Sequence, residues 1–328
     1  MNTSHQEATT LVNEGAQYHL EGDLMAAQQK YKAAIAVDAA NATAYNNLGF
    51  VLSQQQDYAQ ALPNLQTAVE LNPESVSAHI NIGNVYLATQ EHDKAADHYS
   101  TALQLNPKHA LAWESYARFF VAQGQAEEAA KAWHQALQLK PAHLPYKTEL
   151  AIALAALQRY GPAIQLLNQV VQHSTRDARA WKQLGILYFM RKDYGLAEGC
   201  LLNAQSIRPK DTSVLYHLAL VKLSTNDAQK ALAYFREALL HQPSAIEVRV
   251  DLAVVLLSQA KPSEAEAELG IALGQDATHP KARYYAAVVA HQLGKLEVAE
   301  TLLSALSEEH GAFAAKASEY LNLYIHQK

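Results

Sequence analysis

Asparagine side chains recur at a fixed interval near the beginning of the chain. Asn13, Asn47 and Asn81 are 34 residues apart, and Asn46 and Asn84 stand close to them in the sequence. A carboxamide carries both hydrogen-bond donors and acceptors. A row of carboxamides can therefore pair with the backbone of an extended peptide, whatever the side chains of that peptide are. The alternative is that these side chains hydrogen-bond only to neighbouring helix ends and to water.

Motifs that would carry catalysis or hold a metal are missing from the sequence. The 15 histidines form no HExxH motif, and His92 and His98 are spaced to point to different faces of a helix. The sequence has no GxxxxGK[ST], GxGxxG, GxSxG or CxxC motif. The single cysteine, Cys200, has no partner for an internal disulfide and is expected to pack as a small hydrophobic residue. We therefore expect no enzyme activity, no cofactor and no metal site.

Charge and hydropathy narrow the class of protein further. The formal net charge is −6, so the chain has no basic field that would attract nucleic acid. No apolar run approaches the roughly 20 residues of a membrane-spanning helix. The segment from Met1 to Thr10 is polar and lacks the apolar core of a signal peptide. The cytoplasm is the expected compartment, with earlier removal of a signal peptide as the alternative.

The interval between the asparagines is the period of almost the whole chain. From Ala8 onward, nine repeats of 34 residues follow one another without insertion or deletion. Place eight of each repeat is Gly or Ala and place twenty is always Ala, as in Gly49 and Ala61. Small residues at fixed spacing mark places where two helices approach closely, so the period predicts an all-α solenoid of helix pairs. The expected bounds of repeats 1 to 9 are 8–41, 42–75, 76–109, 110–143, 144–177, 178–211, 212–245, 246–279 and 280–313.

Each repeat contains two amphipathic helices separated by a short break. In repeat 3, Ile82 and Tyr86 share one face of the first helix, and Tyr99 and Ala102 share one face of the second. An aspartate often stands near the start of the second helix, where its carboxylate can accept hydrogen bonds from backbone N–H groups that lack a partner. These aspartates are Asp23, Asp57, Asp93, Asp193 and Asp227.

This pattern resembles the tetratricopeptide repeat family. The residues that carry the resemblance are Trp113 and Trp181 at place four, Leu48-Gly49 and Leu184-Gly185 at places seven and eight, and tyrosines such as Tyr86 at place eleven. The resemblance implies a right-handed superhelix in which the first helix of each pair lines a concave groove. It also implies a capping helix over residues 312–328, with Phe313, Leu321 and Tyr324 as its buried face. Residues 1–7 would then be an N-terminal tail.

The resemblance also indicates which side chains face the groove. The asparagine row is similar to one in the repeat arrays of O-GlcNAc transferases, where it holds peptide backbone. The expected peptide-binding residues are Asn13, Asn46, Asn47, Asn81, Asn84, Arg118, Arg179 and Lys182. Later first helices carry an apolar row instead, formed by Ile152, Ile186, Phe189, Met190, Leu220, Leu223, Val254 and Leu257. The alternative for this row is tight packing between repeats that leaves none of it open to a ligand.

These observations predict a non-catalytic interaction scaffold that binds a peptide or a helix of a partner protein in its groove. One alternative is a carrier of a hydrophobic ligand, such as a lipid, in the apolar part of the groove. Another is a detached targeting module for an enzyme on a separate chain. Self-association is a further expectation, with the segment Met1 to Thr10 of one copy entering the groove of another. The sequence does not name the partner.

Overall fold

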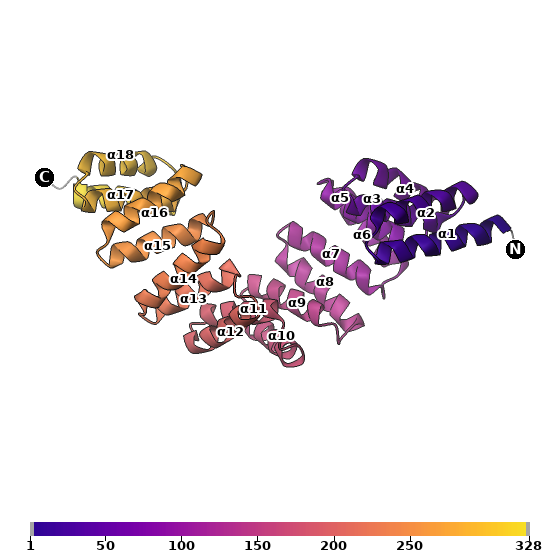
Figure 1. Cartoon of the computed structure of the whole chain (residues 1–328), viewed down its shortest axis with the longest axis horizontal. Helices are drawn as coiled ribbons and strands as arrows, with labels where there is room; N and C mark the ends of the chain where they lie inside the picture. Colours follow the sequence, from indigo (N-terminus) through magenta and orange to yellow (C-terminus); the bar gives the residue numbers. More distant parts are fainter. Residues whose placement is uncertain (1–2, 326–328) are drawn as a thin grey trace. The chain divides into compact units, whose positions relative to one another are not determined.

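The computed structural model describes residues 3–325, and these form a succession of helices joined by short turns (Figure 1). The chain divides into two compact units, one ending at Leu166 and the other beginning at Leu167. We call them the N-terminal and the C-terminal unit. The division falls within α10 (Tyr160–His173).

The N-terminal unit consists of helix pairs. In each pair the first helix packs against the second, and the second packs against the first helix of the next pair. First helices of successive pairs also touch, as α3 and α5 do. The helices before α10 are α1 (Thr3–Leu20), α2 (Leu24–Val37), α3 (Ala42–Gln54), α4 (Tyr58–Leu71), α5 (Val76–Ala88), α6 (His92–Leu105), α7 (Ala110–Ala122), α8 (Ala126–Leu139) and α9 (Leu144–Ala156).

The C-terminal unit repeats this arrangement and ends with a single helix. Its pairs are α11 (Ala178–Met190) with α12 (Tyr194–Ile207), α13 (Thr212–Ser224) with α14 (Ala228–His241), α15 (Ile246–Ser258) with α16 (Pro262–Gln275), and α17 (Pro280–Gln292) with α18 (Leu296–Ser307). The helix α19 (Ala312–Tyr320) and the π-helical segment η1 (Leu321–Ile325) then pack against α18.

Small residues allow the two helices of a pair to approach closely. A Cβ atom on Gly49 would lie 2.5 Å from Leu65 Cγ, and one on Gly83 would lie 2.7 Å from the ring of Tyr99. The alanine at place twenty is fully buried in all nine repeats, from Ala27 to Ala299. This confirms that places eight and twenty are the close contacts that the sequence predicts.

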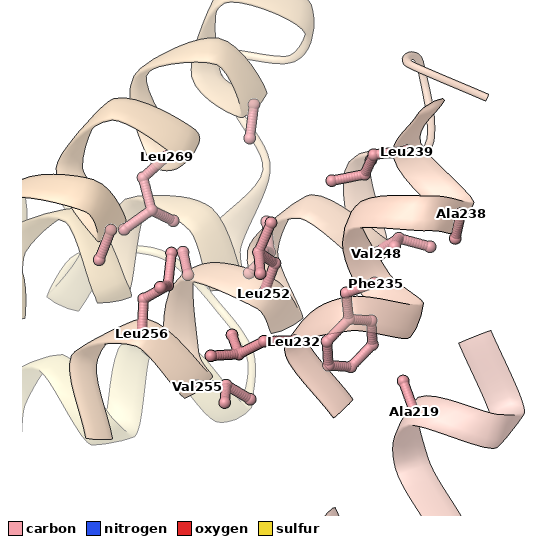
Figure 2. Close-up of a cluster of buried hydrophobic side chains, with 14 of the residues drawn as sticks. Ala219, Leu232, Phe235, Ala238, Leu239, Val248, Leu252, Val255, Leu256 and Leu269 are labelled. Atoms are coloured by element: carbon pink, nitrogen blue, oxygen red, sulfur yellow. The ribbon is translucent and has the colours of Figure 1, made fainter. Parts of the chain in front are cut away.

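The apolar core consists of successive clusters of buried side chains between neighbouring helices, rather than one central cluster. Figure 2 shows part of it in the C-terminal unit, where Phe235 and Leu239 of α14 lie beside Val248 of α15. Leu256 of α15 and Leu269 of α16 continue the same cluster. Each repeat therefore buries its apolar face against its neighbours.

Three of the five aspartates cap the second helix of their repeat. Asp23, Asp57 and Asp227 accept hydrogen bonds from backbone N–H groups of the first turn at 2.9, 3.1 and 3.2 Å. Asp193 stands at the N-cap of α12 without such a bond, and Asp93 lies in the first turn of α6, two residues after its N-cap. The carboxylate at these three caps satisfies a donor that the helix itself leaves open.

Both ends of the chain differ from the sequence-based expectation. The helix α1 begins at Thr3, so residues 3–7 of the expected tail are helical, and they extend α1 ahead of the buried Ala8. At the other end, Leu321 is buried, but Phe313 is only half-buried and Tyr324 is 59% exposed. The expectation that Tyr324 belongs to the buried face is therefore wrong, because no second helix follows within the described residues to cover it. Residues 326–328 of the expected capping helix lie outside the described residues.

Candidate peptide-binding surfaces

Three of the predicted asparagines form one hydrogen-bonded chain in the N-terminal unit. Asn81 Nδ2 of α5 donates to Asn46 Oδ1 of α3 at 3.0 Å, and Asn46 Nδ2 donates to Asn47 Oδ1 at 3.1 Å. All three side chains are half-buried. A carboxamide has two N–H groups and an oxygen with two lone pairs, so each of them keeps hydrogen-bonding capacity after these bonds. We call Asn46, Asn47, Asn81 and Asn84 the carboxamide patch.

The remaining asparagines lie on either side of this chain. Asn84 is exposed one turn further along α5, and its Oδ1 accepts a hydrogen bond from Tyr99 OH at 2.8 Å. Burial raises the pKa of Tyr99, so its hydroxyl stays protonated and keeps donating to Asn84. Asn13 is exposed on α1. The hydrogen bond from Tyr99 thus orients the side chain of Asn84, while the side chain of Asn13 is exposed to solvent.

Two of the predicted basic residues are held by carboxylates of their own unit. The Arg118 guanidinium is 2.8 Å from Glu114, four residues earlier on α7, and Tyr146 OH donates to the other oxygen of that carboxylate at 2.8 Å. In the C-terminal unit, Lys182 Nζ is 3.0 Å from Asp211. Arg179 is exposed on α11. The sequence pattern did not reveal these ion pairs. In them, the carboxylates of Glu114 and Asp211 compensate the positive charges of Arg118 and Lys182.

The predicted apolar row is neither fully buried nor fully open. In the C-terminal unit, Ile186 and Phe189 of α11 and Val254 of α15 are half-buried, whereas Met190 is 54% exposed. Leu220, Leu223 and Leu257 are half-buried too, and they pack against the core drawn in Figure 2. Ile152 belongs to α9 and so lies in the N-terminal unit. Each of these residues presents part of its surface and packs with the rest.

A polar row in the C-terminal unit was missed by the sequence-based reasoning. Tyr216 OH of α13 donates to Asp251 Oδ2 of α15 at 2.8 Å, and Lys281 Nζ of α17 is 2.5 Å from Asp251 Oδ1. Burial first, and the Asp251 charge second, raise the pKa of Tyr216. The hydrogen bond between Tyr216 and Asp251 joins place five of one repeat to place six of the next. The hydrogen bond between Asn46 and Asn81 joins the same two places. Reading places five and six together, across successive repeats, would have shown it.

Ionisable groups that could do chemistry are few. Burial raises the pKa of the Cys200 thiol to about 11, which keeps it protonated and unreactive at neutral pH. Within residues 3–325, no group of three or more His, Cys, Asp or Glu side chains is arranged to hold a metal ion. The same part of the chain contains no helix that is both long and apolar enough to cross a membrane.

Comparison with family models covers most of the chain. Models described as tetratricopeptide repeat or TPR repeat match residues 15–56, 40–108, 222–271 and 250–315, and the cytochrome c-type biogenesis protein H TPR domain matches residues 99–214. Together with the fold, these matches show that the chain belongs to the tetratricopeptide repeat family. Proteins of this family bind protein partners and are generally non-catalytic scaffolds.

The chain also resembles parts of larger curated proteins. It is 29% identical over 115 residues to the BBSome complex member BBS4 of Bos taurus, which is 35% of this chain and 22% of that protein. It is 26% identical over 167 residues to Protein NPG1 of Arabidopsis thaliana, which is 49% of this chain and 24% of that protein. The match therefore spans less than a quarter of the length of either relative.

Solved structures share the fold at low sequence identity. The APC/C hetero-tetramer Cut9-Hcn1 matches with a TM-score of 0.60 and 17% identity, over 88% of this chain and 57% of that one. The pilus biogenesis factor PilW matches at 0.58 and 20%, over 64% and 98%. A tetratricopeptide repeat protein from Parabacteroides merdae matches at 0.55 and 19%, over 76% and 99%. These likenesses concern the fold alone.

Proposed function

We propose that this protein is a scaffold that binds an extended segment of a partner protein on the carboxamide patch. The observation that carries this proposal is the hydrogen-bonded chain from Asn81 through Asn46 to Asn47, which joins two neighbouring first helices. Side chains that fix one another in this way lose little conformational freedom when a peptide binds. The patch would offer donors and acceptors to the peptide backbone, and so would tolerate many peptide sequences.

The half-buried apolar row supports a second contact with the same partner or with another one. Ile186, Phe189 and Met190 lie at the C-terminal end of α11, and each presents apolar surface. An apolar face of a partner helix would bury this surface. The same row is the reason to keep the alternative of a hydrophobic ligand, whereas the targeting module and self-association rest on sequence reasoning alone. The cytoplasm remains the predicted compartment.

The test compares partners captured by the wild-type protein and by the double variant Asn47→Ala, Asn81→Ala. Both bonds of the asparagine chain are lost in this variant, and each neutral hydrogen bond contributes about 0.5–1.5 kcal/mol. We expect a captured protein partner to bind roughly tenfold more weakly, with unchanged helical circular dichroism. Captured proteins and an organic-solvent extract are both analysed by mass spectrometry.

The matched control is Asn203→Ala, which removes an exposed asparagine from the second helix α12. Partner binding should be unchanged in this control. Equal binding of the partner to the double variant and to the wild type would remove the carboxamide patch from the proposal. An enriched lipid without any protein that depends on the patch would favour the hydrophobic carrier instead.

A further inference from the structure

A cavity of about 170 Å³ lies between repeats 4 and 5 of the N-terminal unit. It is bounded by the end of α7, the turn after it, the start of α8, and α9. Val121 is 55% exposed and Ile152 is half-buried, so the cavity is open to solvent on one side. The residues that line it are Val121, Gly124, Ala126, Ala129, Glu149, Ile152, Ala153 and Ala156.

The cavity exists because alanine stands at two places of the repeat there. Place ten holds a larger residue in every other repeat, and place seventeen holds alanine elsewhere only in repeat 7. Ala153 occupies place ten. In the other repeats, place ten holds Gln17, Val51, Val85, Phe119, Leu187, Val221, Val255 and Val289. Ala126 occupies place seventeen, where repeats 2, 5 and 6 carry Tyr58, Tyr160 and Tyr194. Ala126 and Ala153 both line the cavity, so neither of these two places supplies a side chain large enough to fill it.

We propose that this cavity is a pocket for one aliphatic side chain, of leucine, isoleucine or methionine size, in the segment that binds the carboxamide patch. This inference rests on the proposed function and specifies the partner further. A protein cavity of roughly 150 Å³ with apolar walls holds a molecule of benzene size, so the volume suits a single branched side chain. An acidic side chain would lose its hydration in this mostly apolar lining, so the pocket disfavours it.

The distance of the pocket from Asn84 sets how far apart the two contacts lie in the bound segment. Asn84, Arg118 and Ile152 occupy place nine of three successive first helices, α5, α7 and α9. First helices that pack directly, as α5 and α7 do, are spaced by about 8–10 Å. Because α7 and α9 contact each other less, the second step is at least as long, and the two steps together correspond to roughly 20 Å. An extended chain covers this distance in about six residues. The aliphatic residue should therefore lie about six residues from the backbone stretch held by Asn84.

The repeat itself supplies the variant that closes the pocket. Ala126→Tyr with Ala153→Val introduces the residues that the same places carry in other repeats, so it fills the cavity with side chains that this fold accommodates. The single change Ala153→Val serves as a second variant if the double change does not fold. The matched control is Ala228→Tyr, which makes the same substitution at place seventeen of repeat 7, in the C-terminal unit.

The probe is N-acetyl-leucinamide, titrated into the full-length protein with ¹³C-labelled methyl groups and followed by NMR. We expect saturable shifts of the Val121 and Ile152 methyl signals, with binding at least about tenfold tighter than that of N-acetyl-glycinamide. N-acetyl-aspartamide should bind no better than the glycine probe. The filled variant should lose these shifts while its melting temperature is equal to or above that of the wild type, and Ala228→Tyr should keep them.

The outcomes separate this inference from the proposed function. Leucine-specific shifts that survive Asn47→Ala, Asn81→Ala support the pocket even if the carboxamide patch binds no peptide. Shifts that are the same for the leucine and glycine probes, or that persist in the filled variant, overturn the pocket. If the filled variant is more stable than the wild type but shows the same probe-induced shifts, the cavity is a packing defect and not a binding pocket.

Discussion

At the scale of single residues, the side chain at place four ties repeats 3, 4, 6 and 8 to the repeat that precedes each of them. Trp113 Nε1 donates to the carbonyl of Pro107 at 2.9 Å, and Trp181 Nε1 donates to the carbonyl of Thr175 at 2.9 Å. Arg249 makes the same bond to the carbonyl of Pro243 at 2.9 Å. A tryptophan and an arginine differ in charge and shape, yet each donates to the backbone carbonyl of the residue six positions before it. Arg249 therefore preserves the contact rather than disrupting the repeat.

His79 makes the equivalent contact and links it to a second histidine. Its Nε2 is 3.1 Å from the carbonyl of Pro73, and its Nδ1 is 3.0 Å from His98 Nδ1. A carbonyl can only accept, so Nε2 of His79 carries the proton and its Nδ1 accepts from His98. Burial first, and the neighbouring His79 second, lower the pKa of His98, while Asp97 partly offsets them. The ring of Tyr86 packs beside the ring of His98, and the ammonium group of Lys94 lies over the ring of Tyr86.

This pair makes stability depend on pH. The pKa of His98 in the folded state lies below its ordinary value of about 6.5, so the unfolded chain takes up the proton first as the pH falls. We expect the stability of the wild type to decrease below about pH 6.5 and to be fully regained above it. Urea unfolding at pH 7.5 and 5.5 should show a smaller difference for His98→Gln than for the wild type. An equal difference in both proteins would contradict this assignment, because His217, whose pKa is also lowered by burial, is unchanged in the variant.

At the scale of elements, every repeat turns between its two helices through one residue in the left-handed region. This residue is always place fifteen. It is glycine in three repeats, at Gly22, Gly124 and Gly294, and another residue in the other six, at Gln56, Gln90, Gln158, Lys192, Asn226 and Ala260. Such a φ costs a residue with a Cβ roughly 1–2 kcal/mol. Identical turns therefore form from different sequences, because packing of the two helices fixes their ends.

Ala260, with a φ of 57°, is the place where this cost can be removed. Ala260→Gly should raise the stability by about 0.5 kcal/mol, the relief of strain less the greater entropy that glycine adds to the unfolded chain. The control is Ala233→Gly, at an exposed position inside α14, which should lower the stability by about 1 kcal/mol. Urea unfolding of both variants measures the two effects. A loss of stability in Ala260→Gly as large as that in Ala233→Gly would argue against a strained turn.

At the scale of the whole chain, the period of 34 residues was enough to predict the helix pairs but not the contacts between repeats. Small residues at places eight and twenty reveal the fold because only close helix contacts require them. The pairing of Lys281 with Asp251, by contrast, joins side chains of neighbouring repeats, and it depends on a register that one repeat read alone does not contain. Asn13, Asn47 and Asn81 were visible in the sequence because they lie at equivalent places of successive repeats. The cavity beside Ile152 could not be predicted from the sequence, since it results from two small side chains, Ala126 and Ala153, that are distant in sequence.

A chain built from repeated pairs should also respond locally to damage. Because each pair packs mainly on its neighbours, the stability of such a protein is close to a sum of repeat and nearest-neighbour contributions. Phe235 is fully buried in the cluster of Figure 2, and Phe235→Ala should cost about 3–5 kcal/mol there. Hydrogen exchange followed by mass spectrometry should show faster exchange in α13 to α16, the helices of repeats 7 and 8. The protection of α1 to α6 should be unchanged. A uniform increase over all helices would mean instead that the chain unfolds as one cooperative body, and nearest-neighbour coupling would then be the wrong description of its stability.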